Sequence, residues 1–407
     1  MIIRFEKSCA NGYVTAPPSK SMAQRALICA CYSKTPSVIR NVPRCSDIDA
    51  VVGCLKAIGA TICQNGDTYT VSGPEKETTS LPLMNCKESA ATLRFLIPVS
   101  TVLGNGARFT GSKRLLERIG FDDLDFLRSG GIRVLKSGNS LYISGKLQPG
   151  SYTVDGSLSS QWLSGLLLSL PFCGGSSVIT VKNGQVSKPY ADCTLFVLKK
   201  FGVDITNAGY ERFYINGVGN LSGGNDYTVE GDWSNAAFLK SLSLTGGKVC
   251  VGGLDTNSIQ GDRRFDDYFE IMKNAALCAD CTDTPDLVPV LMSCSALLNG
   301  CTLSGISRLR LKESDRVAVM MRELGKFGVK SELSGDKVSV FPSDVQMPAV
   351  PLICENDHRM AMALSLLLCK TGGVLDGAEC VCKSYPTFFD DLKNLGINLF
   401  EISGENL

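Results

Sequence analysis

Small polar and cationic side chains stand at the start of several apolar stretches, and their types suit the binding of anions. Residues 15–33, TAPPSKSMAQRALICACYS, show the pattern first: two prolines end an extended segment, and Lys20 and Ser21 open an apolar helix that contains Arg25. Unpaired amide groups and the helix dipole favour anions at such a start. An ordinary capped helix with two solvated cations would also explain this one segment. The anion site becomes the better interpretation because the pattern is repeated.

Later segments carry further side chains that could bind phosphate or carboxylate groups. They are GSLSSQWLSG with Ser159, Ser160 and Gln161, SKPYAD with Ser187 and Tyr190, ESAATLR with Arg94, ERIG with Arg118, PD with Asp286, NDHR with Arg359, and CKSYP with Lys383. Each serine could equally be a simple helix cap. Cations from several segments suggest a substrate with more than one phosphate or carboxylate.

The strongest local signal is the stretch 308–316, RLRLKESDR. We expect Lys312 and Arg316 to lie four residues apart on one helix face, where like charges repel unless an anion lies beside them. Glu313 could neutralise the pair, and a solvated helix of alternating charge remains an alternative. His358 is the chain's one histidine. Carboxylates and lysines are therefore expected to move protons in any active site.

The helices that must position these residues are repeated about seventy residues apart. They are expected to begin near Lys20, Ser89, Ser159, Ser234, Asp286 and Asp357, with one shorter step before Asp286. A second helix follows each first helix, and five of the second helices end at glycines that suit a helix terminus: Gly59, Gly131, Gly202, Gly328 and Gly396. The sequence thus predicts six α/β units, each a helix, a strand, a second helix and two further strands.

The first helix of each unit is apolar on nearly all sides, as in LLLSLPF and AMALSLLLC, and this predicts burial all round. We expect one interior helix per unit, with sheets and amphipathic helices outside, and three units in each of two domains. The starts of parallel interior helices would share one end of a domain, and two such ends facing each other would attract anions. A doubly wound parallel sheet fits less well, because the last two strands of a unit alternate and carry hairpin turns.

Composition argues against several classes of function. A net charge of +1 over 407 residues gives no basic excess for nucleic acid or an acidic membrane. No apolar run is long enough to span a bilayer or to form a leader at the N-terminus, so we expect a cytosolic location. The 18 cysteines are expected to be buried reduced thiols, since only Cys278 and Cys281 form a CxxC pair. Neither a metal site nor a cofactor is predicted, and a GxxxxGK[ST] phosphate loop does not occur.

Eight short motifs follow one another in a fixed order: PSKSxxxRAL, xSxxTxRxL, SSQxxxxLL, SKPYxD, PD, KExDR, NDHRxAM and KSYP. Through them the chain resembles, over its whole length, the 5-enolpyruvylshikimate-3-phosphate synthases. The resemblance implies a two-domain inside-out α/β barrel built from six βαβαββ-type repeats, three per domain. It also implies one domain of residues 19–229, a discontinuous domain of residues 1–18 with 230–407, and an active site in the cleft between them.

The reaction implied by this resemblance transfers the enolpyruvyl group of phosphoenolpyruvate to the 5-hydroxyl of shikimate 3-phosphate and releases phosphate, in the shikimate pathway to aromatic amino acids. A cytoplasmic monomer is expected. Asp286 would lie near the 5-hydroxyl, Glu313 would protonate the methylene carbon, and Lys20 would touch both substrates. The implied ligands of shikimate 3-phosphate are Lys20, Ser21, Arg25, Ser159, Ser160, Gln161, Ser187, Tyr190, Asp286 and Lys312. The implied ligands of phosphoenolpyruvate are Lys20, Ala90, Arg94, Arg118, Gln161, Arg316, Arg359 and Lys383.

The chain departs from the family pattern at a few positions. Arg308 stands where many relatives carry Asn, which leaves one shikimate contact open, and Lys87 and Glu88 replace a common Gly-Asn. Ala90 stands where a glycine is usual. Its methyl group beside the small anion site would crowd glyphosate, the family's known inhibitor, so the sequence predicts relative insensitivity to glyphosate.

Two alternatives remain at this point. One is the sister transferase that places enolpyruvate on a UDP-sugar, but that class generally uses a loop cysteine and residues 104–120 contain none. The other is a non-catalytic, anion-binding repeat protein, which would not need Asp286 and Glu313 together with the lysines.

Overall fold

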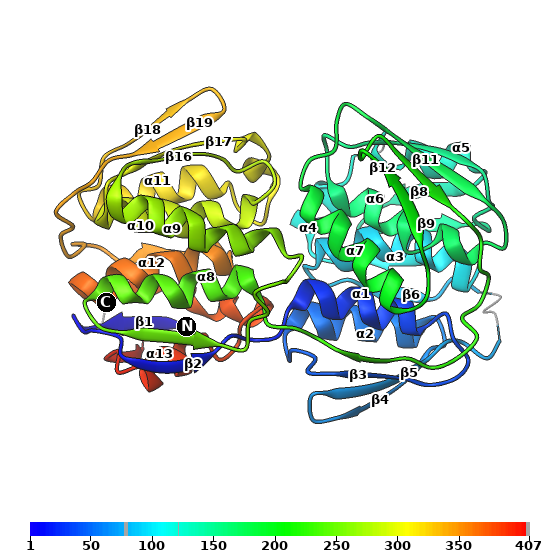
Figure 1. Ribbon diagram of the computed structural model, residues 1–407, viewed down its shortest axis with the longest axis horizontal. Helices are drawn as coiled ribbons and strands as arrows, with labels where there is room; N and C mark the ends of the chain where they lie inside the picture. The colour runs from blue at the N-terminus through cyan, green and yellow to red at the C-terminus, as the bar shows by residue number, and fades with distance from the viewer. Residues whose placement is uncertain (77–79, 121, 404–407) are drawn as a thin grey trace. The chain divides into compact units, whose positions relative to one another are not determined.

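The computed structural model describes residues 1–76, 80–120 and 122–403. The chain forms two compact units (Figure 1). We call Pro18–Glu230 the continuous unit, and Met1–Pro17 together with Gly231–Leu407 the discontinuous unit. Among the helices that the structure describes, none combines the length and apolar character needed to cross a membrane.

The continuous unit contains three four-stranded sheets that share one pattern. In each sheet the first two strands are parallel, and the third and fourth follow antiparallel. The first sheet orders β14 (Asp226–Thr228), β3 (Ser37–Arg40), β5 (Thr68–Ser72) and β4 (Thr61–Asn65). The second orders β6 (Leu83–Asn85), β7 (Gly106–Thr110), β9 (Ser140–Ser144) and β8 (Arg133–Ser137), and the third β10 (Ser151–Asp155), β11 (Ser177–Lys182), β13 (Arg212–Ile215) and β12 (Ile205–Ala208). These mixed sheets confirm the α/β repeat and exclude a doubly wound parallel sheet here.

Three helices fill the interior of this unit, one from each repeat: α1 (Lys20–Ala30), α3 (Ala90–Leu103) and α6 (Ser160–Leu167). Their residues are almost all buried, as the all-round apolar sequences predict. The Gln24 amide donates to Ser89 Oγ and Thr92 Oγ1, which places the first turns of α1 and α3 side by side. The Arg94 guanidinium donates to Gln161 Oε1 and joins the first turns of α3 and α6. The polar helix starts of the unit therefore lie at one end of its core.

Shorter or amphipathic helices connect the strands of the unit. They are α2 (Ser46–Ala57), α4 (Lys113–Glu117), η1 (Asp122–Leu124), α5 (Asp125–Ser129), η2 (Leu170–Phe172) and α7 (Lys188–Lys200). The expected terminal glycines have left-handed backbone, with φ of 100° at Gly59, 81° at Gly131 and 79° at Gly202. Only glycine adopts this conformation without strain, which explains why the sequence repeats it after these helices.

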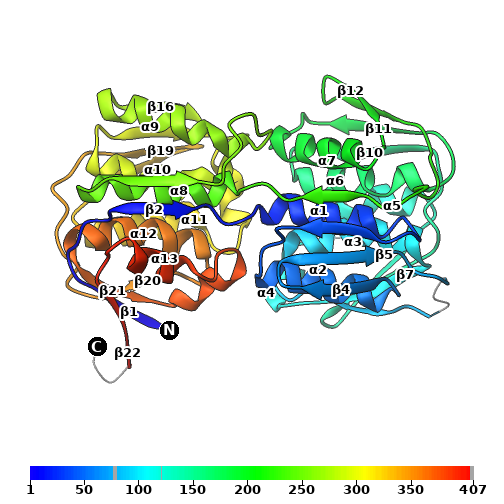
Figure 2. The same cartoon turned by 60° about the horizontal axis from the view of Figure 1, so that its bottom comes forward.

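The discontinuous unit has two four-stranded sheets of the same pattern and a two-stranded one. One sheet orders β16 (Leu277–Asp280), β17 (Cys301–Ser304), β19 (Lys337–Val340) and β18 (Ser331–Ser334), and the other β20 (Leu352–Ile353), β21 (Gly373–Asp376), β1 (Ile2–Phe5) and β22 (Leu399–Ile402). The shortened fourth repeat gives only β15 (Val249–Gly252) beside β2 (Gly12–Thr15). The first residues of the chain thus complete two sheets of this unit. Figures 1 and 2 show β1 and β2 in blue near α12 (His358–Thr371) and α13 (Phe388–Asn394), which come late in the chain.

The interior helices of this unit are α8 (Trp233–Ser241), α10 (Val288–Leu297) and α12 (His358–Thr371), and they contact one another. The helices outside them are α9 (Phe265–Asn274), α11 (Arg316–Lys326) and α13 (Phe388–Asn394). Short 3-10 turns link these elements: η3 (Leu242–Thr245), η4 (Gly261–Arg264), η5 (Pro285–Leu287), η6 (Ser307–Leu311) and η7 (Ala378–Lys383). The helix start expected near Asp286 is therefore a 3-10 turn that leads into α10.

Candidate active site

Lys20, the first residue of α1, is tied to a carboxylate on the neighbouring helix. Its Nζ lies 2.8 Å from Asp47 Oδ2, and the two side chains are 15% and 7% exposed. Asp47 lies in the first turn of α2, where the helix dipole favours a negative side chain. The ion pair holds a cation at the start of an interior helix, where the sequence predicts a side chain that binds an anion.

Arg25 lies one turn further into α1 and is 2% exposed. Its Nε donates to Thr194 Oγ1 at 2.7 Å, its Nη1 to the carbonyl of Ser21 at 2.7 Å and its Nη2 to the carbonyl of Tyr190 at 3.0 Å. The guanidinium also lies over the ring of Phe95, 4.8 Å from its centroid. Burial lowers the pKa of Arg25 from its ordinary value, and neutral oxygens carry most of its contacts. The buried guanidinium of Arg25 therefore donates hydrogen bonds to oxygens of both α1 and α7.

The expected serine and tyrosine ligands lie at the starts of α6 and α7. Ser159 Oγ caps α6 by accepting from the Gln161 amide, and Ser160 is buried. Ser187 opens α7 with φ of 54°, a left-handed conformation that a serine adopts at some cost. Tyr190 follows in the first turn, and its amide donates to the carbonyl of Ser187. The strained Ser187 is the kind of backbone that functional sites retain.

The second repeat brings two arginines together. Arg94 Nη1 donates to Gln161 Oε1 at 2.7 Å and Nη2 to the carbonyl of Arg118 at 3.3 Å, while its guanidinium lies over the ring of Trp162. Ala90 is the first residue of α3 and is 7% exposed. These residues come from three different elements and lie around the starts of α3 and α6.

The discontinuous unit gathers its predicted site residues into one ion-pair cluster around Arg316. The guanidinium donates to Asp286 Oδ1 at 2.8 Å, to Asp357 Oδ2 at 2.8 Å and to Glu313 Oε2 at 3.1 Å. Although burial opposes its charge, these three carboxylates together raise the pKa of Arg316 above its ordinary value. Asp357 caps α12 and is fully buried, so its charge is balanced within the cluster.

Three further cations complete this cluster. Arg359 Nη2 donates to Asp286 Oδ2 at 3.0 Å, Lys383 Nζ donates to Glu313 Oε1 at 3.0 Å, and Lys312 Nζ lies 3.6 Å from Asp286 Oδ1. These ion pairs therefore join four cationic side chains to three carboxylates. His358 is buried beside the cap of α12, with its Nδ1 3.8 Å from Asp357 Oδ1.

Opposing effects set the charge of Asp286. Burial would raise the pKa of this carboxyl, but Arg359, Lys312 and Arg316 outweigh burial and hold the pKa well below its ordinary value. Burial lowers the pKa of Lys312, which Asp286 partly restores. Asp286 is therefore a carboxylate whose basicity depends on what else these three cations bind.

The expectation that Lys312 and Arg316 share one helix face is wrong. Lys312 follows η6 with extended backbone, and α11 begins at Arg316 after the cap residue Asp315, whose side chain accepts from the Ala318 amide. The two cations nevertheless meet on Asp286. Arg308, the departure from the family pattern, donates to the carbonyl of Thr282 at 3.0 Å.

Comparison with known proteins decides the family. The family model for EPSP synthase (3-phosphoshikimate 1-carboxyvinyltransferase) matches residues 6–392. The 3-phosphoshikimate 1-carboxyvinyltransferase of Clostridium acetobutylicum is 35% identical, covering 98% of this chain and 99% of that protein. That of Clostridium kluyveri is 36% identical, covering 97% of each. The chain belongs to the EPSP synthase family.

Two solved structures have the same fold as this chain. The EPSP synthase from Acinetobacter baumannii has a TM-score of 0.79 at 21% identity and covers 98% of this chain and 100% of that one. The enolpyruvyl transferase NikO from Streptomyces tendae has a TM-score of 0.79 at 17% identity, with 98% of each chain covered. The family model and the clostridial relatives, rather than these structures, identify this family member as a transferase, a 3-phosphoshikimate 1-carboxyvinyltransferase (EC 2.5.1.19), of the shikimate pathway and aromatic amino-acid biosynthesis.

Two acidic residues in contact with predicted ligands were not among the expected site residues of this EPSP synthase family member. Asp47 pairs with Lys20, and Asp357 pairs with Arg316. Both stand at helix starts, so the sequence predicts them only as capping or dipole residues. Their cationic partners belong to other helices, and the sequence could not connect the two members of each pair.

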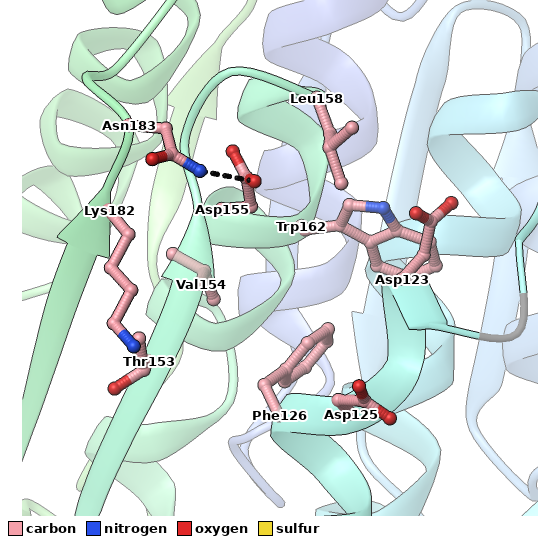
Figure 3. Close-up of a pocket in the computed structure, with 10 residues that line it drawn as sticks. All are labelled: Asp123, Asp125, Phe126, Thr153, Val154, Asp155, Leu158, Trp162, Lys182 and Asn183. Atoms are coloured by element: carbon pink, nitrogen blue, oxygen red, sulfur yellow. Dashed lines mark hydrogen bonds between the residues drawn. The ribbon is translucent and has the colours of Figure 1, made fainter.

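The cavity in Figure 3 belongs to the continuous unit and contains none of the predicted ligands. It has a volume of about 210 Å³ and is bordered by Asp123, Asp125, Phe126, Thr153, Val154, Asp155, Leu158, Trp162, Lys182 and Asn183. Asn183 donates to Asp155 at its edge. Lys182 is the one cation among these ten residues, against three acids, which is a poor lining for an anion. The predicted ligands of this unit lie instead at its helix starts, and those of the discontinuous unit lie in the Arg316 cluster.

Proposed function

We propose that this enzyme transfers the enolpyruvyl group of phosphoenolpyruvate to the 5-hydroxyl of shikimate 3-phosphate and releases phosphate. The observation that carries the proposal is the cluster around Arg316, in which Asp286 and Glu313 lie among four cations. Guanidinium groups suit the carboxylate and phosphate of phosphoenolpyruvate, and two carboxylates beside them can move the protons.

The proposed chemistry begins with proton transfer. Asp286 accepts the proton of the 5-hydroxyl, the hydroxyl oxygen forms a bond to C2 of phosphoenolpyruvate, and Glu313 gives a proton to the methylene carbon C3. In the second half the Glu313 carboxylate takes a proton back from this methyl group, the double bond re-forms and the bond from C2 to the phosphate oxygen breaks. Phosphate takes the electron pair, accepts the proton held by Asp286 and leaves. Lys312 and Lys383 lie beside the charges that change.

Substrate binding would make Asp286 a stronger base. Arg316 and Arg359 hold its pKa low, and phosphoenolpyruvate would attract these same arginines through its carboxylate and phosphate. As the arginines turn to the substrate, the pKa of Asp286 would rise. The base would therefore be active when its substrate is present.

We propose ligands for each of the two substrates. Lys20 is proposed to touch both. The proposed shikimate 3-phosphate ligands are Lys20, Ser21, Arg25, Ser159, Ser160, Gln161, Ser187, Tyr190, Asp286 and Lys312. The proposed phosphoenolpyruvate ligands are Lys20, Ala90, Arg94, Arg118, Gln161, Arg316, Arg359 and Lys383. The burial of Arg25, Ser160 and Ser187, and the hydrogen bond from Arg25 to Thr194 Oγ1, support their part of this assignment.

We extend the proposal to the inhibitor response, the location and the assembly of the enzyme. Ala90 would make the enzyme relatively insensitive to glyphosate. A cytosolic monomer is proposed, and the free thiols of the cysteines suit a reducing compartment. Light scattering of the purified protein measures its mass directly, and a dimer mass would contradict the monomer.

Phosphate release tests the proposed reaction. Purified enzyme and phosphoenolpyruvate should release phosphate with shikimate 3-phosphate as the acceptor and not with a UDP-sugar. The product should carry the enolpyruvyl group on the 5-oxygen, as carbon NMR would establish. Release only with the UDP-sugar, or with neither acceptor, would overturn the proposal.

A further inference from the structure

Two loops of the continuous unit leave the same edge of one sheet and lead to predicted ligands. β10 and β11 are parallel, and their last residues, Asp155 and Lys182, are paired. Residues 156–159, which we call the first loop, lead from β10 into α6, and residues 183–187, the second loop, lead from β11 into α7. The spacing of the two loops therefore sets the spacing of the predicted ligands, which are Ser159 and Ser160 beside the first loop and Ser187 and Tyr190 beside the second.

The side chain of Asp155 joins the two loops. Its Oδ1 accepts hydrogen bonds from the amide and the hydroxyl of Ser157 in the first loop, at 2.9 Å and 2.5 Å. Its Oδ2 accepts from Nδ2 of Asn183 in the second loop at 2.7 Å (Figure 3). The Ser157 hydroxyl lowers the pKa of Asp155 from its ordinary value, and the amides of Ser157 and Asn183 add to this effect, although burial opposes them. One ionised carboxylate thus binds a donor from each loop.

The backbones of the two loops also meet. The amide of Val186 donates to the carbonyl of Gly156 at 3.1 Å. A β-carbon on Gly156 would come within 2.5 Å of the carbonyl oxygen of Gly184, so a larger residue at this position would push the loops apart. The helices that follow are joined one turn further on, where Thr194 donates to Ser164 at 2.9 Å. The two loops therefore form a close junction, and a shift of one loop displaces the other.

The second loop has a backbone that needs this support. Asn183 and Ser187 have φ of 61° and 54°, in the left-handed region that side chains adopt at a cost. Such backbone persists where the surrounding contacts hold it in place. Asp155 holds Asn183, and the Val186 amide is bonded directly before Ser187. Loss of the Asp155 contact would let this loop relax and would shift Ser187.

We propose that Asp155 is a positioning residue for the proposed reaction, which holds the serines of the two loops at the spacing that shikimate 3-phosphate requires. The inference rests on the proposed function in taking Ser159, Ser160 and Ser187 as ligands of this substrate. If Asp155 only stabilised the fold, loss of its contact would lower the unfolding temperature and would not favour one substrate over the other. The positioning role predicts a selective loss of affinity for shikimate 3-phosphate.

The test breaks the junction and then rebuilds it with the two partners exchanged. Asn183→Gly removes the donor, and glycine adopts the left-handed backbone without strain. The double variant Asp155→Asn with Asn183→Asp again has one amide and one carboxylate, in reverse order. Both variants keep the net charge of the native enzyme. A difference between them therefore reports the contact between the loops and not the overall attraction of a phosphate.

Calorimetry should show that Asn183→Gly binds shikimate 3-phosphate roughly 10-fold more weakly than the native enzyme, as for loss of a hydrogen bond to a charged group. The double variant should bind it within about 3-fold of the native affinity. KM for phosphoenolpyruvate should change by no more than about 2-fold, because Arg316 and Arg359 are held by other elements. Gln64→Ala is the matched control, since it removes an exposed side-chain amide that donates to the carbonyl of Gly66 in another turn of the same unit. It should bind like the native enzyme.

Equal affinity of the native enzyme and Asn183→Gly for shikimate 3-phosphate would overturn the proposal. A double variant that binds no better than Asn183→Gly would also overturn it. If the double variant does not fold, Gly156→Ala separates the loops through the backbone and should weaken the same substrate selectively. Unchanged binding by Gly156→Ala would count against the positioning role. Because binding is measured without turnover, a native enzyme that binds shikimate 3-phosphate but releases no phosphate would contradict the proposed function and not this inference.

Discussion

Arg316 contacts Asp286 through a short hydrogen bond, from Nη1 to Oδ1 at 2.8 Å. The same guanidinium also donates to Glu313, the proposed acid, at 3.1 Å. Because one arginine joins the proposed base and the proposed acid, an anion that binds this arginine changes the surroundings of both carboxylates at once. Proton transfer would thus be coupled to the arrival of phosphoenolpyruvate, which supplies such an anion.

Replacing Glu313 by Gln should lower turnover and leave substrate binding nearly intact. The amide keeps the shape of the side chain but cannot give a proton to carbon, and loss of a general acid typically costs about 10²-fold or more in kcat. Steady-state kcat and KM for both substrates measure the effect. Turnover within a few-fold of the native value would show that Glu313 is not the acid.

Replacing Lys20 by Met should damage binding and turnover together, because Lys20 is proposed to touch both substrates. Asp47→Asn should have a smaller effect, since it leaves the cation but removes the carboxylate 2.8 Å away that positions it. Binding of each substrate by calorimetry, together with kcat, separates the two variants. Unchanged affinity of Lys20→Met for either substrate would remove Lys20 from that substrate's site.

Replacing Asp286 by Asn should destabilise the protein at neutral pH, by about 3 kcal/mol as for other broken buried pairs. The folded pKa of Asp286 lies well below its ordinary value, so its stabilising effect is present above about pH 4 and is lost as the pH falls through the folded pKa. The difference in unfolding free energy between the native enzyme and the variant should therefore shrink in acid. Asp267→Asn, at an exposed position, is the control. A difference that stays constant from pH 7 to pH 3 would contradict the low pKa.

The sequence predicts the interior helices well, because their burial depends on a local pattern. Lys20 opens α1, and Asp357 caps α12 as expected. Gly202 and Gly328 follow the second helices with φ near 80° because only glycine fits that backbone easily. Such features are set by neighbours within one or two turns.

Contacts between separate elements could not be predicted in this way. The spacing of Lys312 and Arg316 suggests one helix, yet Lys312 itself has extended backbone and α11 begins only at Arg316, so the two cations contact Asp286 from different elements. The local sequence identifies Asp47 only as an acidic residue in the first turn of α2, whereas its partner Lys20 belongs to α1. Pairing of this kind depends on how helices pack, and nothing in the local pattern encodes it.

Ala90 tests whether the proposed phosphoenolpyruvate site discriminates against glyphosate. It is the first residue of α3, 7% exposed, directly after Ser89, whose Oγ caps the helix by accepting from the Thr92 amide. The proposal places its methyl group beside the site of phosphoenolpyruvate, where the longer glyphosate would meet it. Overpacking of this kind costs about 1 to 3 kcal/mol, or roughly 5- to 150-fold in affinity.

Ala90→Gly should therefore strengthen glyphosate inhibition by such a factor and change KM for phosphoenolpyruvate much less. Glycine also weakens a helix by up to about 1 kcal/mol, so thermal unfolding of both forms must be measured beside inhibition. Equal and tight inhibition of the native enzyme and Ala90→Gly would show that the methyl group points away from the inhibitor.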